Sequence, residues 1–100
     1  MDAAALRELQ KPLKTAYRED PDAAATPIRA AGRFEGDAIT TTVETWAGPT
    51  RAGLHPATGG SGEDACSGDM LLQALVACAG VTMRSVATAT GVVIRGATLS

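Results

Sequence analysis

Two cysteines are the side chains of this sequence best suited to covalent chemistry, because a thiolate is both a nucleophile and a metal ligand. Cys78 lies in an uncharged stretch, residues 70–83, and Cys66 precedes it by twelve positions. That separation is about 18 Å along a continuous helix, whereas a disulfide needs Cα atoms within about 7 Å of each other. A bridge within one helix is therefore excluded, and a bridge between two subunits stays open.

Cys78 has two interpretations. It can serve only as a small hydrophobic side chain, which is the common case for a free cysteine, or it can be a reactive thiol, which needs exposure and a nearby positive charge. Apolar neighbours disfavour a thiolate, and the helix dipole acts mainly in the end turns. A reactive Cys78 therefore needs a cation from outside its own helix.

Arg33 and Arg51 are the candidate cations, since both lie in segments before the helix that can fold back toward it. Arg84 lies about one and a half turns beyond Cys78 on the same helix and points away from it. Each arginine can equally be a solvated surface charge, because arginine is mostly exposed in folded proteins. Arg33 and Arg51 remain equal candidates on this reasoning.

The acidic and imidazole side chains near the start of the helix are weaker candidates for a catalytic or metal-binding role. Asp69 falls in the first turn, where the helix dipole favours a negative charge, and nine residues at about 100° each place it opposite Cys78. Glu63 and Asp64, in the preceding loop, can reach round the helix more easily. His55 has no second histidine and no Cys-x-x-Cys spacing beside it, so neither a metal nor another cofactor is expected.

The helix that carries Cys78 is the strongest element of the sequence. Ser67 can cap its start and Gly91 can end it, so a helix is predicted over about residues 68–90. Apolar residues lie on every side of this helix, as in a helix buried in a protein core. Its uncharged part is shorter than the about 20 residues that span a bilayer. We therefore expect the centre of a soluble core.

The segments before the helix predict a helical arm and a small sheet. Leucines and a tyrosine at spacings of three and four predict a helix over residues 2–17, with a break or kink at Pro12. Residues 27–34 and 38–46 flank a Glu-Gly-Asp turn and predict a β-hairpin. A further short strand is expected near residues 50–53.

The predicted fold is α+β. An antiparallel β-hairpin or sheet packs on the long, buried central helix, and a last strand starts at residue 92. All of this is expected to form one domain over residues 1–100. Because two or three strands supply too little cover for the helix, a homodimer or a larger intertwined assembly is also expected.

Composition narrows the class of protein. The net charge is −2, with both signs interspersed and no basic run, so no nucleic-acid partner is expected. The N-terminus lacks the apolar core of a signal peptide, and two cysteines are too few for a disulfide framework. The expected location is the cytoplasm, without a membrane partner.

Two runs resemble a known family. SGDMLLQALVACAGVTMRSVA, residues 67–87, resembles the central helix of the OsmC/Ohr superfamily, which has an acid, then Leu-Leu-x-Ala-Leu, then a cysteine. HPATGGSGEDACSGD, residues 55–69, resembles the glycine-rich segment before that helix in one OsmC-like branch. Asp69 aligns with the acid that opens the family helix.

The resemblance implies an OsmC-like fold and a thiol-dependent peroxidase that reduces organic hydroperoxides in oxidative stress defence. Cys78 would be the peroxidatic nucleophile, Arg33 or Arg51 would orient the peroxide, and an external thiol would be the reductant. The second cysteine of these peroxidases lies far downstream, so Cys66 does not correspond to it. The resemblance also points to homodimers.

Family members continue beyond the position of Ser100 with several more elements, among them a second long helix. The resemblance therefore implies an incomplete C-terminal part, either truncated or supplied by another chain. A non-catalytic alternative stays open. In it Cys78 is structural, and the chain is an assembly partner or binds small apolar molecules.

Overall fold

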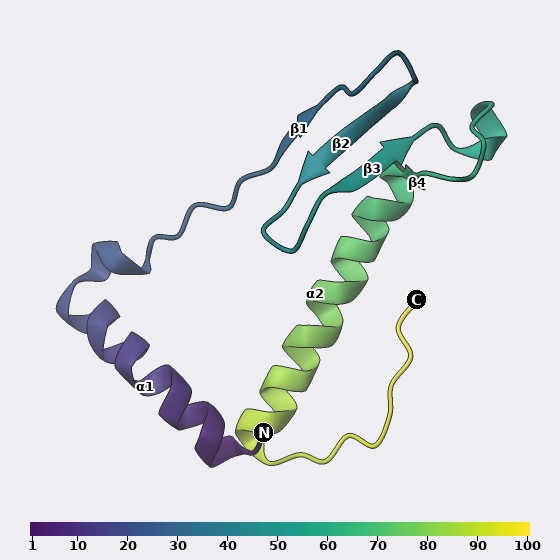
Figure 1. The fold of residues 1–100 in the computed structure, drawn as a ribbon. Helices are drawn as coiled ribbons and strands as arrows, with labels where there is room; N and C mark the ends of the chain where they lie inside the picture. Colours follow the sequence, from purple (N-terminus) through teal and green to yellow (C-terminus); the bar gives the residue numbers. More distant parts are fainter. The chain divides into compact units, whose positions relative to one another are not determined.

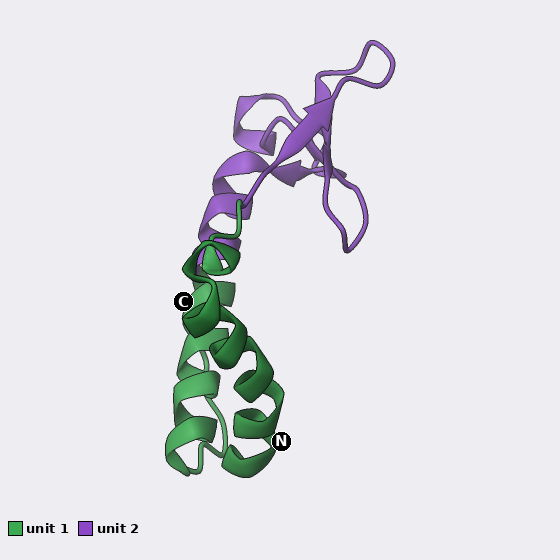
Figure 2. Ribbon diagram, turned by 90° about the vertical axis from the view of Figure 1, so that its left-hand side faces the viewer, with its two compact units in different colours: residues 1–27, 76–100 green, residues 28–75 purple.

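The chain forms two compact units in the computed structural model, which describes residues 1–100. Unit 1 consists of Met1–Pro27 and Val76–Ser100, and unit 2 of Ile28–Leu75 (Figure 2). The fold is α+β, as predicted, with a four-stranded sheet and two long helices. One of these helices, which carries Cys78, contributes residues to both units.

Unit 2 contains the sheet, in the order β1-β2-β3-β4 (Figure 1). The strands are β1 (Ala31–Arg33), β2 (Thr40–Glu44), β3 (Thr50–Gly53) and β4 (Ala65–Cys66). β1 and β2 form the predicted antiparallel hairpin, and β3 is antiparallel to β2.

The sheet is mixed, which corrects the expectation of an antiparallel sheet, because β4 runs parallel to β3. Parallel neighbours need a long connection between them, and residues 54–64 provide it. β4 leads directly into α2 (Ser67–Thr90), so this connection also determines where the helix begins.

The connection between β3 and β4 is held by local hydrogen bonds. The Nδ1 atom of His55 accepts a hydrogen bond of 3.0 Å from the N–H of Ala57 and caps the 3-10 helix Pro56–Thr58. Gly59 ends that helix with a φ of +98°, a conformation that favours glycine. His55 therefore has a structural role in this loop.

Helix α2 begins one residue before the predicted start and ends at the predicted stop. Gly91 has a φ of +73°, and the N–H of Val92 donates to the carbonyl of Ala87 at 2.9 Å, which closes the helix end. Residues 92–100 have no regular secondary structure, so the strand predicted from residue 92 is not present. An isolated strand has no neighbour to accept its backbone hydrogen bonds.

The predicted burial of α2 is wrong for the single chain. Leu71, Leu75 and Val76 are 65%, 61% and 38% exposed, and the only buried hydrophobic residue is Ala87. Short strands with few large apolar side chains have little surface with which to cover a helix. Within unit 2, only the first turn of α2, at Met70, lines a hollow together with the sheet.

Length and composition also make α2 apolar enough to cross a membrane, with a mean hydropathy of 1.5 over 18 residues. The prediction from the sequence rested on the uncharged residues 70–83, whereas the 18-residue segment with this hydropathy extends beyond them. Core helices of soluble proteins have the same composition, so hydropathy does not decide where the helix lies.

Unit 1 contains α1 (Ala3–Glu19), close to the predicted helix over residues 2–17. The carboxylate of Asp2 accepts a hydrogen bond of 2.9 Å from the N–H of Ala5, and this bond holds the pKa of Asp2 below its ordinary value. The predicted break at Pro12 is wrong, because the helix continues through it. Glu8, whose carbonyl loses its helical partner, is exposed and open to water.

Gly60 provides a test of the loop before β4. A Cβ atom at this position would overlap the carbonyl oxygen of Leu54, and backbone cannot move aside cheaply. We expect Gly60→Ala to destabilise the protein by about 2 kcal/mol or more, in the upper range for single substitutions, as measured by urea unfolding. Gly96→Ala is the matched control, since a Cβ there meets nothing within 4 Å. Equal stability of the two variants would contradict this loop geometry.

Candidate functional site

Cys78 is a free and exposed thiol in unit 1. The exposure meets one requirement of a reactive cysteine, which the predicted apolar core would have denied it. The only charged side chain in the unit 1 part of α2 is Arg84. Its Nη1 donates a hydrogen bond of 3.0 Å to the carbonyl of Ile94, so this guanidinium is engaged by the C-terminal segment.

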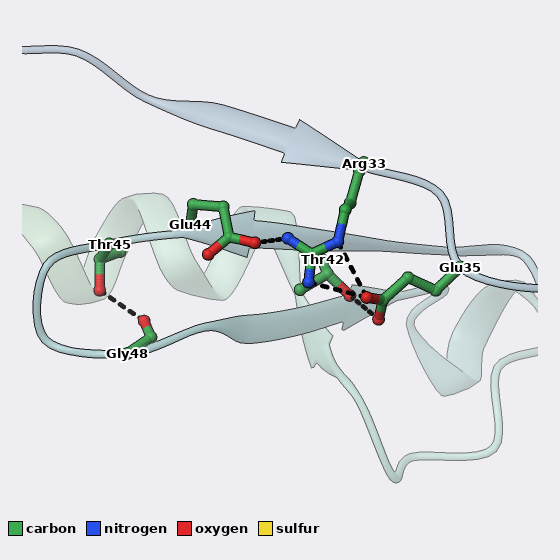
Figure 3. Close-up of polar contacts among 6 residues, drawn as sticks. All are labelled: Arg33, Glu35, Thr42, Glu44, Thr45 and Gly48. Carbon is green, nitrogen blue, oxygen red and sulfur yellow. Dashed lines mark hydrogen bonds and ion pairs between the residues drawn. The ribbon is translucent and has the colours of Figure 1, made fainter.

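Arg33 lies at the end of β1 between two carboxylates (Figure 3). Its Nε donates to Oε1 of Glu35 at 2.9 Å, its Nη2 lies 2.7 Å from the same oxygen, and its Nη1 pairs with Glu44. All three guanidinium nitrogens therefore face acids. These side chains are about half exposed, so the ion pairs contribute little to stability.

Thr42 completes this cluster and is 6% exposed. Its hydroxyl donates a hydrogen bond of 2.8 Å to Oε2 of Glu35 (Figure 3). This bond, followed by the contacts with Arg33, lowers the pKa of Glu35 below its ordinary value. Thr42 was not among the candidates predicted from the sequence. Its place in the cluster depends on the strand register, which brings cross-strand neighbours on one face together.

Arg51 lies on β3 and pairs with Asp64, whose Oδ1 is 2.5 Å from the arginine Nε. The hydrogen bond raises the pKa of Arg51. The Asp64 side chain is 15% exposed, against 56% for Arg51, so this acid is held in the loop while the guanidinium faces solvent. Both Nη groups of Arg51 are free of ion pairs, whereas every guanidinium nitrogen of Arg33 faces a carboxylate.

The sheet brings the two predicted arginines together. Thr42 is the register partner of Arg33 on β1 and of Arg51 on β3, so the three residues form one row across the sheet. Directly opposed residues share a face, and the charge of Arg51 also contributes to the low pKa of Glu35. The row and its acids form a cluster of five charged residues, Arg33, Arg51, Glu35, Glu44 and Asp64.

The opposite face of the sheet is apolar. Thr41 and Val43 alternate with Thr42 along β2, so they point away from the arginine row. They line a hollow of about 720 Å³ within unit 2. Its other large side chains are Phe34, Ile39, Leu54 and Met70. The first turn of α2 therefore adjoins the face of the sheet that lacks the arginines.

The remaining candidates have the following places. Cys66 is half-buried in β4, and Asp69 is exposed in the first turn of α2. The N–H of Glu63 donates to the hydroxyl of Ser61 at 3.2 Å. No three His, Cys, Asp or Glu side chains are grouped so as to hold a metal ion. Cys78 belongs to unit 1 and both arginines of the row to unit 2, so their proximity stays a prediction.

Comparisons of the chain with protein-family models, with curated proteins and with solved structures give no match. The likeness to the OsmC/Ohr superfamily therefore rests on the two runs, residues 55–69 and 67–87, that carry it.

The Thr42 hydroxyl provides a test of the cluster. Thr42→Val removes the largest cause of the low pKa of Glu35, so the carboxyl should titrate at higher pH, closer to the ordinary glutamate value. A depressed pKa stabilises the folded state above the unfolded value of about 4.3, and this stabilisation is lost as the pH falls through the folded value. The variant should therefore show a smaller loss of stability from this group on acidification. NMR titration of the Glu35 carboxyl carbon measures the shift.

The control is Thr45→Val, which also removes a threonine hydroxyl from this hairpin region. The hydroxyl of Thr45 donates to the carbonyl of Gly48 at 2.6 Å, away from Glu35 (Figure 3). This control should leave the titration of Glu35 unchanged. An unchanged titration in Thr42→Val as well would contradict the hydrogen bond.

Proposed function

We propose that this protein is an OsmC-like thiol peroxidase that reduces organic hydroperoxides in oxidative stress defence, with Cys78 as its nucleophile. The observation that carries the proposal is a free, exposed thiol at the position where the resembled family has its peroxidatic cysteine. A thiol buried in a single-chain core would have been inert toward a peroxide.

The reaction needs only the thiol, the peroxide and an external reductant. The thiolate sulfur attacks the terminal oxygen of the hydroperoxide, a sulfur–oxygen bond forms, and the oxygen–oxygen bond breaks. The alkoxide leaves and takes a proton to become an alcohol, while the cysteine is oxidised by two electrons to a sulfenic acid. One external thiol then displaces water to give a mixed disulfide, and a second one releases the cysteine.

Arg51 is the better candidate for the activating cation. Both Nη groups of Arg51 are free of ion pairs, whereas two carboxylates occupy the three nitrogens of Arg33. A guanidinium that already faces two acids has little remaining field with which to stabilise a thiolate. We therefore rank Arg51 above Arg33, which the sequence alone left equal.

The active form is proposed to be a homodimer or a larger assembly. The exposed leucines of α2 require a partner surface. In such an assembly, the cation beside Cys78 can come from a second copy.

A non-catalytic module is the second candidate. The hollow of about 720 Å³ in unit 2 has a size typical of sites for small molecules and is lined largely by apolar side chains. In this alternative, Cys78 packs against a partner chain and has no reaction with peroxide. The kinetics of the thiol separate the two candidates.

The first prediction for the proposed function concerns the reactivity of the thiol. In the assembled protein, we expect alkylation of Cys78 to reach half its maximal rate well below pH 8.5, the region of an ordinary thiol. Arg51→Ala should move this midpoint to higher pH by about one unit or more, which corresponds to about 1.4 kcal/mol. Below the midpoint, each such unit lowers the thiolate fraction about tenfold, so the consumption of an organic hydroperoxide should slow at least about tenfold. Arg33→Ala should have a smaller effect.

Cys66→Ser is the background for these measurements, and Cys78→Ser should abolish peroxide consumption. An alkylation midpoint near pH 8.5 that neither arginine substitution changes would remove the enzymatic interpretation. Cys78 would then be a packing residue.

The second prediction concerns assembly. Sedimentation at micromolar concentration should show a dimer or a larger species. Leu75→Gln should weaken that association at least about tenfold, because burying one leucine side chain contributes about 1.5–3 kcal/mol. Ile28→Gln replaces a residue that is 98% exposed and lies outside α2, so it is the matched control. A monomeric wild type that unfolds cooperatively would count against the assembly.

A further inference from the structure

Helix α1 has an exposed apolar stripe. Leu6, Leu9, Leu13 and Tyr17 follow the helical repeat and share one side of the helix. Leu6 is half-buried in a hollow of unit 1, together with the second half of α2. Leu9, Leu13 and Tyr17 are 59%, 51% and 39% exposed. Most of the stripe is therefore uncovered in the single chain.

A basic stripe lies beside the apolar stripe of α1. Arg7, Lys11, Lys14 and Arg18 are separated by four, three and four residues and lie within about 60° on the helix, at 100° per residue. They are four of the nine lysines and arginines in a chain of net charge −2. All four are exposed, and none forms an ion pair within the chain.

We propose that α1 is an in-plane amphipathic helix that docks on a lipid bilayer containing anionic lipid. The apolar stripe would enter the boundary between headgroups and acyl chains, and the basic stripe would meet the lipid phosphates. A strongly amphipathic helix with low overall hydrophobicity and cations on its polar side is typical of this mode of binding. The two acids of the helix, Glu8 and Glu19, lie about 60° and 80° from Lys11, at the edge of the basic stripe on the polar side of the helix.

Charge decides between a bilayer and a second copy of the chain as the occupant. The apolar surface of α2 in a second copy, residues 70–83, has no charged side chain. It would cover the leucines of α1 but leave the four cations without anions. An anionic bilayer satisfies both stripes together.

The inference differs from a membrane span and from the sequence expectation of no membrane partner. That expectation rested on the uncharged residues 70–83, which are too few to span a bilayer. The cations of α1 are separated in sequence and come together only on the helix surface. A helix that lies in the plane of the membrane needs no long apolar segment.

Vesicle binding by the full chain tests the proposal. Wild type should bind vesicles of phosphatidylcholine mixed with phosphatidylglycerol, bind pure phosphatidylcholine far more weakly, and lose affinity as salt is added. Lys11→Gln combined with Lys14→Gln should weaken binding about 30-fold, from about 1 kcal/mol per charge near an anionic surface. Leu9→Gln combined with Leu13→Gln should lower it further. Circular dichroism should show unchanged helix content in each variant.

Arg29→Gln combined with Arg95→Gln is the matched control, since it removes the same charge from exposed positions outside α1. It should retain most of the affinity, as should Cys78→Ser, which makes this test independent of the peroxidase activity. Failure to bind anionic vesicles, or equal losses in the lysine variant and the arginine control, would overturn the proposal. So would binding that neither α1 variant reduces, which would assign the membrane contact to α2. Dissociation of the assembly by the leucine variant, with vesicle binding intact, would assign α1 to a second copy.

Discussion

The uncovered apolar surface of α2 is the constraint on which the rest of the structure depends. A helix with apolar residues on every side gains its stability from burial, yet Leu71 and Leu75 remain more than half exposed. The sheet has short strands with few large side chains and offers no compensating surface. The isolated chain has almost no core, and this is why the proposed active form contains more than one copy.

The sheet separates charge from apolar surface. One face carries the row of Arg33, Thr42 and Arg51, while Thr41 and Val43 point to the other face and line a hollow. The acids of the charged face make the two arginines unequal, because carboxylates face all three nitrogens of Arg33 but only the Nε of Arg51. The proposed choice of Arg51 over Arg33 as the activating cation thus follows from the neighbouring acids.

Helix α1 illustrates how surface chemistry arises from helical spacing. Its cations are separated from one another in the sequence, and so are its leucines. At 100° per residue they form adjacent basic and apolar stripes. The same periodicity that makes α1 a helix therefore also makes it suited to a surface that is apolar and anionic.

The sequence by itself determined the local elements. Helix α1, the stop of α2 at Gly91 and strand β2 depend on hydrogen bonds and sterics within a few residues, so they lie within the predicted segments or close to them. Cys78 was chosen as the candidate nucleophile from its sequence motif, and that role is a proposal. The strand predicted after Gly91 is not present, because a strand needs a neighbour that no local pattern supplies.

Tertiary structure alone decided the strand register, the parallel β4 and the exposure of α2. The row through Thr42 and the pairing of Arg51 with Asp64 join segments separated in sequence, so no local pattern determines them. Periodicity shows which residues need cover but not what covers them. For this reason the burial of α2 was predicted wrongly within the single chain, although its helical bounds were predicted to within one residue.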